Sequence, residues 1–268
     1  MITGNTRLYA ILADPVAQVR TPQVINAWFR EHQVDAVLVP MHVPAGDLDA
    51  VLDALRRMRN LGGFIVTVPH KTAIAERCDE LGPAGQAIGS VNTVRRTADG
   101  RLVGEMFDGA GFVSGLQTQG HDLAHKRVLL LGAGGAGSAI AFALAQAGAA
   151  SVTVANRTPA RAHALVERVR KALPQATIEA GAPEPEGHDI IVNATSLGMR
   201  AEDALPLDVE RLAPDMLVAE IIMKPEQTRL LDEAQRRGCP IHHGRHMLDR
   251  QVALMTQFLL QGQPEAVN

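Results

Sequence analysis

The fold follows from one stretch of this chain, Gly132-Ala133-Gly134-Gly135-Ala136-Gly137. It comes after an apolar run at residues 127–131 and opens into a helix-forming run at residues 138–145. A strand, a glycine turn and a helix start in this order are typical of a dinucleotide-binding turn. Gly132 permits the tight turn, Gly134 lets backbone approach a pyrophosphate, and Gly137 lets helix and strand pack closely. We therefore predict that residues 132–137 bind the pyrophosphate of a dinucleotide.

The next predicted strand, residues 151–155, ends in Asn156-Arg157-Thr158, where an NAD-binding protein usually carries Asp or Glu. A carboxylate there would accept a hydrogen bond from the ribose 2′-hydroxyl and repel a 2′-phosphate. Arg157, with Arg161 one helical turn later, would instead pair with that phosphate as a planar donor. The segment predicts NADP rather than NAD, although a solvated surface charge is the alternative reading of Arg157.

Composition limits the class of protein. With 268 residues and 46% apolar content, the chain can fill the cores of two modest domains. Its 26 basic and 29 acidic residues are interspersed, so no single-sign field attracts nucleic acid or an anionic membrane. Cys78 and Cys239 are too few for a disulfide framework. Because no signal segment or membrane-length apolar run is found, we expect a cytoplasmic location. The partner that we expect is a small-molecule substrate, with the chain a monomer or homodimer.

Short apolar runs alternate with helical stretches, which predicts an α/β fold with parallel strands and crossover helices. The expected strands are residues 8–12, 36–40, 63–68, 127–131, 151–155, 190–193 and 217–220. The expected helices are residues 22–30, 47–60 and 247–260, with a further helix within 104–120. We predict a substrate domain of residues 1–104 plus 238–268, and a Rossmann-type NADP-binding domain of residues 105–237, with a cleft between them.

A dehydrogenase needs a group that accepts the alcohol proton as hydride leaves. Lys71, just beyond the predicted strand 63–68, is the best placed candidate, and Asp108 could supply a carboxylate that orients it. Taken alone, either residue is more often a solvated surface charge.

Several segments together resemble the shikimate dehydrogenase family. These segments are Val66-Thr67-Val68-Pro69-His70-Lys71, Gly89-Ser90-Val91-Asn92-Thr93, Asp108-Gly109, the Gly132 turn, Asn156-Arg157-Thr158, Asn193-Ala194-Thr195-Ser196-Leu197-Gly198-Met199 and Gln251. The resemblance covers nearly the whole chain. It implies a reversible, NADP-linked interconversion of 3-dehydroshikimate and shikimate, a step of aromatic amino acid biosynthesis, in a two-domain cleft.

The resemblance also implies roles for individual residues. Lys71 matches the catalytic lysine, and Asp108 matches the aspartate that pairs with it at the reacting hydroxyl. Thr67, Asn92 and Gln251 match contacts to the ring hydroxyls. The wall beside the nicotinamide is matched by Asn193, Ala194, Thr195 and Met199, although turn formation is an alternative role for Asn92 and Asn193.

The substrate half departs from the family pattern. Val19-Arg20-Thr21 replaces a Ser-x-Ser or Ser-x-Thr pair that anchors the substrate carboxylate, which leaves Thr21 as the remaining hydroxyl donor. Ile65, Met106-Phe107 and Met223 also replace polar residues of the pattern. A polyhydroxylated acid would lose about 0.5–1.5 kcal/mol for each lost partner. Arg20 could clamp a carboxylate, or it could point into solvent.

Three alternatives therefore stay open. The substrate could be shikimate or quinate, an aminoshikimate or another secondary alcohol, or the chain could be an NADPH-binding regulator that has lost efficient catalysis. His70 and the group His242, His243 and His246 invite a metal reading, but their spacing does not require a metal. We predict no metal.

Overall fold

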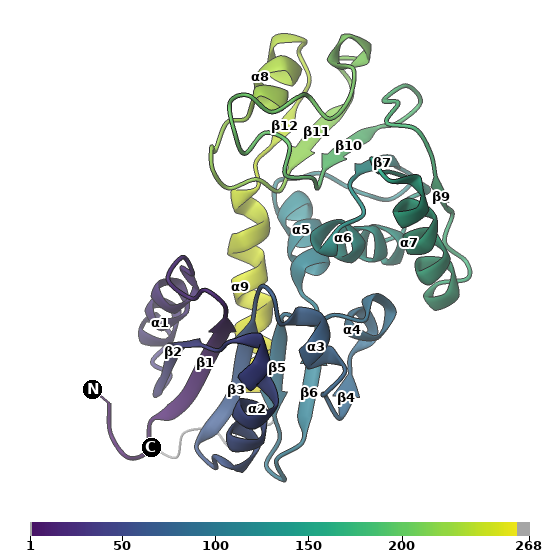
Figure 1. The fold of residues 1–268 in the computed structure, drawn as a ribbon. Helices are drawn as coiled ribbons and strands as arrows, with labels where there is room; N and C mark the ends of the chain where they lie inside the picture. Colours follow the sequence, from purple (N-terminus) through teal and green to yellow (C-terminus); the bar gives the residue numbers. More distant parts are fainter. Residues whose placement is uncertain (1, 262–268) are drawn as a thin grey trace. The chain divides into compact units, whose positions relative to one another are not determined.

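The structure is a computed structural model that describes residues 2–261. The chain divides into two compact units, residues 1–107 with 252–268, and residues 108–251 (Figure 1). The expected boundaries were 104/105 and 237/238. The structure divides the chain at 107/108 and 251/252. The second boundary lies beyond β12 (Ile241–His242), because this strand pairs with β11 (Leu217–Glu220) of the second unit. Residues 262–268 of the predicted substrate domain lie outside the described residues.

The first unit is built on a six-stranded mixed sheet in the order β2-β1-β3-β5-β6-β4. Its elements are β1 (Arg7–Ala13), α1 (Thr21–Glu31), β2 (Ala36–His42), η1 (Ala45–Asp47), α2 (Leu48–Arg57), β3 (Leu61–Val66), α3 (Lys71–Ala75), β4 (Glu80–Leu81), α4 (Pro83–Ile88), β5 (Thr93–Arg96) and β6 (Leu102–Glu105). The expected strands at 8–12 and 36–40 and the helix at 22–30 are confirmed, and the helix expected at 47–60 is found but ends earlier, at Arg57.

Two features of this sheet differ from the sequence prediction. β5 runs antiparallel to β3 and to β6, so the sheet is not built of parallel strands alone. These four-residue strands are too short to give a clear periodic pattern. β3 ends at Val66 rather than Val68, because the chain turns at Thr67, whose carbonyl accepts a hydrogen bond from the His70 amide at 3.0 Å.

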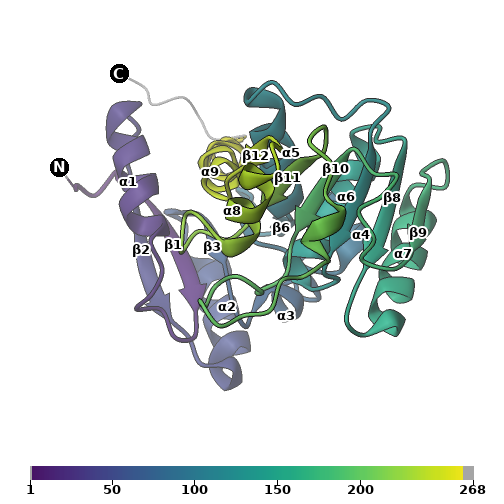
Figure 2. The same ribbon diagram turned by 90° about the horizontal axis from the view of Figure 1, so that it is seen from above.

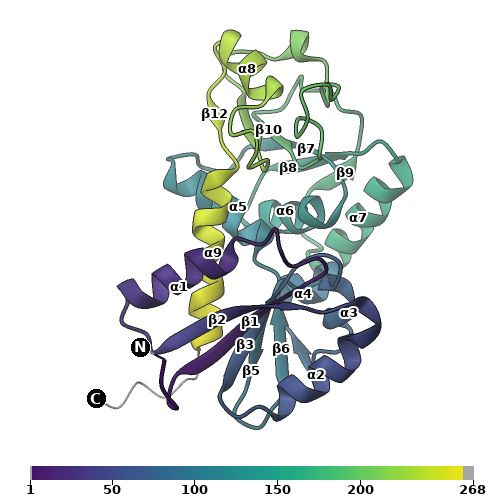
Figure 3. The ribbon, with the colours of Figure 1, turned by 60° about the vertical axis from the view of Figure 1, so that its left-hand side comes forward.

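Alternate residues of β1 face the two sides of this sheet. Tyr9 meets Phe29 of α1 at a ring-centroid distance of 5.5 Å, and its hydroxyl donates to the Leu259 carbonyl of α9 (Arg245–Leu260) at 3.4 Å. Leu12 belongs to the opposite core cluster, which includes Leu52 of α2. Figure 3 shows α1 and α2 against this sheet. Helices therefore cover both faces of the central strands.

The second unit contains a fully parallel six-stranded sheet in the order β12-β11-β10-β7-β8-β9. Its other elements are α5 (Asp108–Thr118), β7 (Arg127–Leu131), α6 (Gly135–Gln146), β8 (Ser151–Ala155), α7 (Pro159–Ala172), β9 (Ile178–Ala180), β10 (Ile190–Asn193), η2 (Val209–Arg211) and α8 (Arg229–Arg236). Figure 2 shows α7 beside β8 and β9. This is the 3-2-1-4-5-6 order of a dinucleotide-binding sheet, and it reverses between β7 and β10.

Glycines let α5 pack closely in this unit. A Cβ on Gly109 would lie 2.0 Å from the Ala139 carbonyl oxygen of α6. A Cβ on Gly111 or Gly115 would lie 2.9 Å from the Gln251 Cβ or 3.0 Å from the His246 backbone of α9. The first turns of α9 therefore belong with α5. Among the described residues, no helix has the length and apolar character to cross a bilayer.

Gly109→Ala tests this packing. We expect the variant to lose about 1–3 kcal/mol of unfolding free energy, because its Cβ would displace α6 backbone rather than a flexible side chain. Urea unfolding followed by circular dichroism measures the loss. Gly135→Ala is the matched control in the same unit, since its Cβ would meet nothing within 4 Å. Equal stability of the two variants would contradict the packing argument.

Candidate cofactor site and catalytic residues

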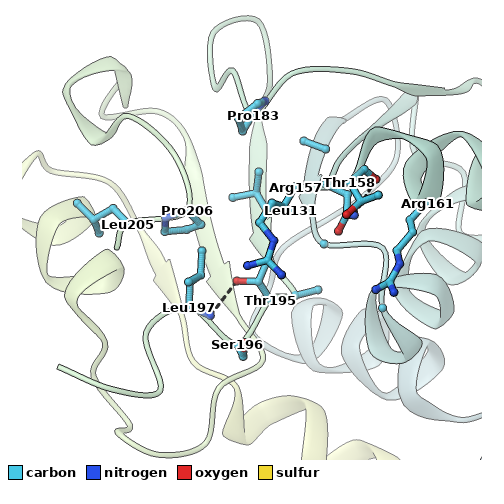
Figure 4. Close-up of a pocket in the computed structure, with 15 residues that line it drawn as sticks. Leu131, Arg157, Thr158, Arg161, Pro183, Thr195, Ser196, Leu197, Leu205 and Pro206 are labelled. Atoms are coloured by element: carbon cyan, nitrogen blue, oxygen red, sulfur yellow. Dashed lines mark hydrogen bonds between the residues drawn. The ribbon is translucent and has the colours of Figure 1, made fainter. Parts of the chain in front are cut away.

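A hollow of about 520 Å³ lies at the carboxyl ends of β7, β8 and β10, where the strand order reverses. An open parallel sheet places ligands at such a switch point. The lining residues, shown in Figure 4, are Leu131, Gly132, Gly134, Ala155, Asn156, Arg157, Thr158, Arg161, Pro183, Ala194, Thr195, Ser196, Leu197, Leu205 and Pro206.

The glycine turn has two kinds of glycine. Gly132 has φ +108°, and a Cβ on Gly137 would lie 2.1 Å from the Gly132 carbonyl oxygen, so both positions need glycine for the backbone itself. Gly134 and Gly135 are exposed, and a Cβ on either would meet nothing within 4 Å. This open space lies at the N-terminus of the twelve-residue helix α6, where backbone amides favour an anion.

Asn156 connects the glycine turn to the segment after β8. Its Oδ1 accepts a hydrogen bond from the Ala133 amide at 3.0 Å, and its Nδ2 donates to the Thr158 carbonyl at 2.9 Å. Arg157 and Arg161 are exposed and line the same hollow. Figure 4 shows their side chains extended in the same direction. Two guanidinium groups thus line the same hollow as the glycine turn.

The segment after β10 forms another wall of the hollow. Ala194, Thr195 and Leu197 line it, and the Thr195 Oγ1 accepts a hydrogen bond from the Leu197 amide at 3.0 Å (Figure 4). Asn193 is fully buried and is not among the lining residues, so it supports the wall from behind. Met199 is 58% exposed and also lies outside the lining.

Asp108 and Gln251 are brought together within the second unit. Asp108 is the first residue of α5 and is 5% exposed. The Nε2 of Gln251, on α9, donates a hydrogen bond to its Oδ1 at 2.5 Å. From the sequence, Asp108 was predicted to pair with Lys71 and Gln251 to contact a ring hydroxyl. Their pairing has no sequence signal, because 143 positions separate the two residues.

Lys71 begins α3 in the first unit and is half-buried. Its carbonyl accepts a hydrogen bond from the Val91 amide at 3.0 Å, which joins the start of α3 to the segment before β5. Asn92 is buried in that segment, and its Oδ1 accepts hydrogen bonds from the Phe107 amide at 3.0 Å and the Thr93 hydroxyl at 3.1 Å. The Asn92 side chain therefore holds backbone in this segment, a role that can exist alongside the predicted contact to a ring hydroxyl.

The other predicted substrate residues of this unit lie at element ends. Thr67 follows β3, and Val19 and Thr21 flank Arg20, the exposed N-cap residue of α1. Ile65 is 3% exposed, so its side chain belongs to the core of the unit. Met223, in the second unit after β11, is 43% exposed.

Met106 and Phe107, which stand where the family pattern has polar residues, follow β6 in the first unit. Met106 is 1% exposed and belongs to the core. Phe107 packs edge to face on Phe258, at a centroid distance of 5.3 Å.

The histidines form packing contacts. A ring nitrogen of His70 lies 2.7 Å from the Val43 carbonyl. His242 is buried against His246, with ring centroids 4.9 Å apart, and burial lowers the pKa of His242 to about 3. Within residues 2–261, no group of three or more His, Cys, Asp or Glu side chains has an arrangement suited to a metal ion.

Comparisons with known proteins agree with this geometry. Residues 11–94 match the shikimate dehydrogenase substrate binding domain, and residues 115–199 match shikimate / quinate 5-dehydrogenase. The shikimate dehydrogenase (NADP(+)) of Lysinibacillus sphaericus is 38% identical over 96% of this chain and 93% of its own length.

Two solved structures have the same fold over nearly their whole length. Shikimate 5-dehydrogenase from Listeria monocytogenes, in complex with shikimate and NAD, superposes with a TM-score of 0.91 at 31% identity, covering 98% of this chain and 95% of that one. The 5-ketofructose reductase of a Gluconobacter strain superposes with a TM-score of 0.89 at 33% identity, covering 96% and 94%. The resemblance seen in the sequence is therefore confirmed, and this chain belongs to the shikimate dehydrogenase family.

Proposed function

We propose that this protein is an NADP(H)-dependent oxidoreductase that transfers hydride reversibly between NADP and a cyclic hydroxy acid of the shikimate type. The observation that carries the proposal is the hollow at the β7/β10 switch point, which is lined by the glycine turn and by two arginines. The shikimate dehydrogenase (NADP(+)) of Lysinibacillus sphaericus supports the same cofactor and reaction.

The hollow fits the proposed cofactor. The open space over Gly134 and Gly135 has room for phosphates at the N-terminus of α6, and Arg157 with Arg161 suits a 2′-phosphate. Ala194 and Thr195 would stand beside the nicotinamide. When bound, NADP supplies the acceptor or donor of hydride.

In this proposal Lys71 moves the proton. Its amine accepts the proton of the substrate hydroxyl as hydride leaves, and returns it in the reverse direction. Asp108 orients the lysine and the reacting hydroxyl, and Gln251 holds the Asp108 carboxylate through its 2.5 Å hydrogen bond. Thr67 and Thr21 would contact the substrate from the first unit.

The proposal predicts the behaviour of Lys71→Ala. We expect NADPH-linked turnover of shikimate-like acids to fall at least 100-fold, since general acid-base groups contribute about 10²–10⁴-fold. NADPH affinity, measured by fluorescence titration, should stay within twofold. Lys126→Ala, at an exposed position, is the control. Absence of turnover by the wild type on a broad panel of shikimate, quinate, related acids and neutral sugar ketones, with tight NADPH binding, would instead identify a cofactor-binding regulator.

Cofactor choice is tested at Arg157. Arg157→Ala should weaken NADPH binding about tenfold and leave NADH binding unchanged. A tenfold loss is close to the contribution of one charge-assisted hydrogen bond, about 1.5 kcal/mol. Titration of both cofactors measures this ratio. Arg168→Ala, at an exposed position on the same helix α7, serves as the control. An equal loss for NADPH and NADH would remove Arg157 from 2′-phosphate recognition.

A second substrate class is favoured by one comparison. The similar protein from Gluconobacter is a 5-ketofructose reductase, whose printed substrate is a sugar ketone and not an acid. Val19, which stands where the family pattern has a carboxylate-binding hydroxyl, is consistent with a substrate that has no carboxylate. An uncharged polyhydroxy ketone is therefore the second candidate.

Val19→Ser distinguishes the two classes. If a missing hydroxyl limits recognition of a carboxylate, the variant should raise kcat/KM for shikimate about tenfold, the effect of one charge-assisted hydrogen bond. The same measurement with a neutral sugar ketone should show no gain. Val24→Ser, at a 40% exposed position on α1, is the control. An unchanged kcat/KM for shikimate would exclude the missing hydroxyl as the limit.

A further inference from the structure

Glu220 is a fully buried carboxyl group directly behind the proposed cofactor wall. It ends β11 and is paired in register with Asn193, which ends β10. The neighbouring residues of its strand are apolar and buried, as expected of a central parallel strand. Burying a carboxyl group at such a position costs free energy of folding, and hydrogen bonds to the group offset this cost only in part.

The contacts of Glu220 run toward the loop after β10. Its Oε1 accepts a hydrogen bond from Asn193 Nδ2 at 3.0 Å and another from the Thr228 hydroxyl at 3.0 Å. Thr228 is the N-cap residue of α8, and its Oγ1 also accepts from the Leu231 amide at 3.3 Å. One oxygen atom therefore connects β10, β11 and α8.

Asn193 passes this connection to the wall of the hollow. Its Oδ1 accepts from the Thr195 amide at 3.0 Å and the Thr195 hydroxyl at 2.7 Å, and its Nδ2 also donates to the Leu197 carbonyl at 3.0 Å. All four hydrogen-bonding positions of the amide group are used inside the protein. Thr195 and Leu197 in turn line the hollow.

The orientation of the Asn193 amide needs a selecting partner. The oxygen and nitrogen ends have nearly the same shape, so packing alone cannot distinguish them. A flipped amide would place Nδ2 against the Thr195 amide, a donor facing a donor, and Oδ1 against Glu220, an acceptor facing an acceptor. The Thr195 amide, the Leu197 carbonyl and the Glu220 carboxyl oxygen therefore favour the same orientation, and Glu220 is the side chain among them that reaches Asn193 from the neighbouring strand.

We propose that Glu220 is a positioning residue, which fixes the Asn193 amide and through it the wall formed by residues 194–197. The reading of this wall as a cofactor wall rests on the proposed function. The positioning itself rests on the described contacts.

Burial gives Glu220 a second, titratable signature. Desolvation raises the pKa of Glu220 to about 7, while the hydrogen bonds from Asn193 and Thr228 lower it, and no charged side chain contributes. The charged side chains of α8, which packs against β11, are Arg229, Asp232, Glu233 and Arg236. Among the described residues, the Oε2 atom is buried without a hydrogen-bond partner, which adds to the cost of an ionised carboxylate at this position.

Glu220 makes the stability of the folded protein depend on pH. Because the pKa is raised in the folded state, protonated Glu220 adds stability that is complete below pH 4.5 and is lost as pH rises through about 7. Glu220→Gln keeps an acceptor for Asn193 and Thr228 and has no charge to bury. Relative to wild type, the Gln variant should therefore gain stability between pH 5 and pH 8.

The experiment compares Glu220→Gln, Glu220→Leu, Asn193→Ala and the double variant Glu220→Leu/Asn193→Ala. Hydrogen exchange of residues 194–197 is measured in the cofactor-free protein, so this readout does not depend on the proposed function. We expect at least tenfold faster exchange in the Leu and Ala variants, no further increase in the double variant, and wild-type exchange in the Gln variant at pH 6. Glu179→Leu, at an exposed position on β9, should leave exchange unchanged.

NADPH titration of the same variants supplies the functional readout. The Leu and Ala variants should each bind about tenfold more weakly, with a double variant no weaker than either, because both residues act through one amide. Additive losses, or unchanged exchange of residues 194–197 in Glu220→Leu, would overturn the proposal. Where Glu220→Leu fails to fold, unchanged exchange of residues 194–197 in Asn193→Ala overturns it. Failure of NADPH to bind the wild type would contradict the proposed function and leave the exchange result to decide the role of Glu220.

Discussion

The close approach of backbone to backbone at the glycine turn is the constraint on which the second unit depends. A side chain at Gly137 would overlap the Gly132 carbonyl, 2.1 Å from its Cβ, and a side chain at Gly132 would crowd the Ala194 carbonyl, 3.0 Å away. These contacts bring the end of β7, the start of α6 and the segment after β10 to one point. The hollow lies at that point because the sheet order reverses there.

Two side-chain amides, those of half-buried Asn156 and fully buried Asn193, keep the segments around this point in place. Asn156 connects the glycine turn to the segment that carries Arg157, and Asn193 connects the end of β10 to Thr195 and Leu197. Both side chains were predicted as cofactor-binding residues from the family pattern. The structure adds a positional role, since each uses its amide to hold backbone that lines the hollow, and only Asn156 lines it itself.

The sequence predicted much of the second unit, because its strands are buried on both faces and read as unbroken apolar runs. Strands at 127–131, 151–155, 190–193 and 217–220 are found with the predicted bounds. The β5–β6 pair was missed, since four-residue strands give too little pattern. The boundary expected at 237/238 is found at 251/252. The sequence does not indicate this position, because β12 has only two residues and α9 packs on Gly111 and Gly115, which are distant in sequence.

In the candidate site, too, features encoded by neighbouring residues could be predicted, whereas contacts between residues far apart in the sequence could not. Residues 132–137 and Arg157 could be recognised because the glycine turn and its spacing from the next strand are local signals. Glu220 gave only a weak signal, a lone acidic residue at the end of an apolar run, and its partner Asn193 lies 27 positions away. The contact between Gln251 and Asp108 gave none.

The central claim is that the hollow of the second unit binds NADP through the 2′-phosphate. Calorimetric titration of the wild-type protein with NADPH and with NADH, at one pH and salt concentration, tests this most directly. The account predicts at least tenfold tighter binding of NADPH, and a preference that weakens as salt screens the two arginines. Equal affinity for the two cofactors, or tighter binding of NADH, would contradict it.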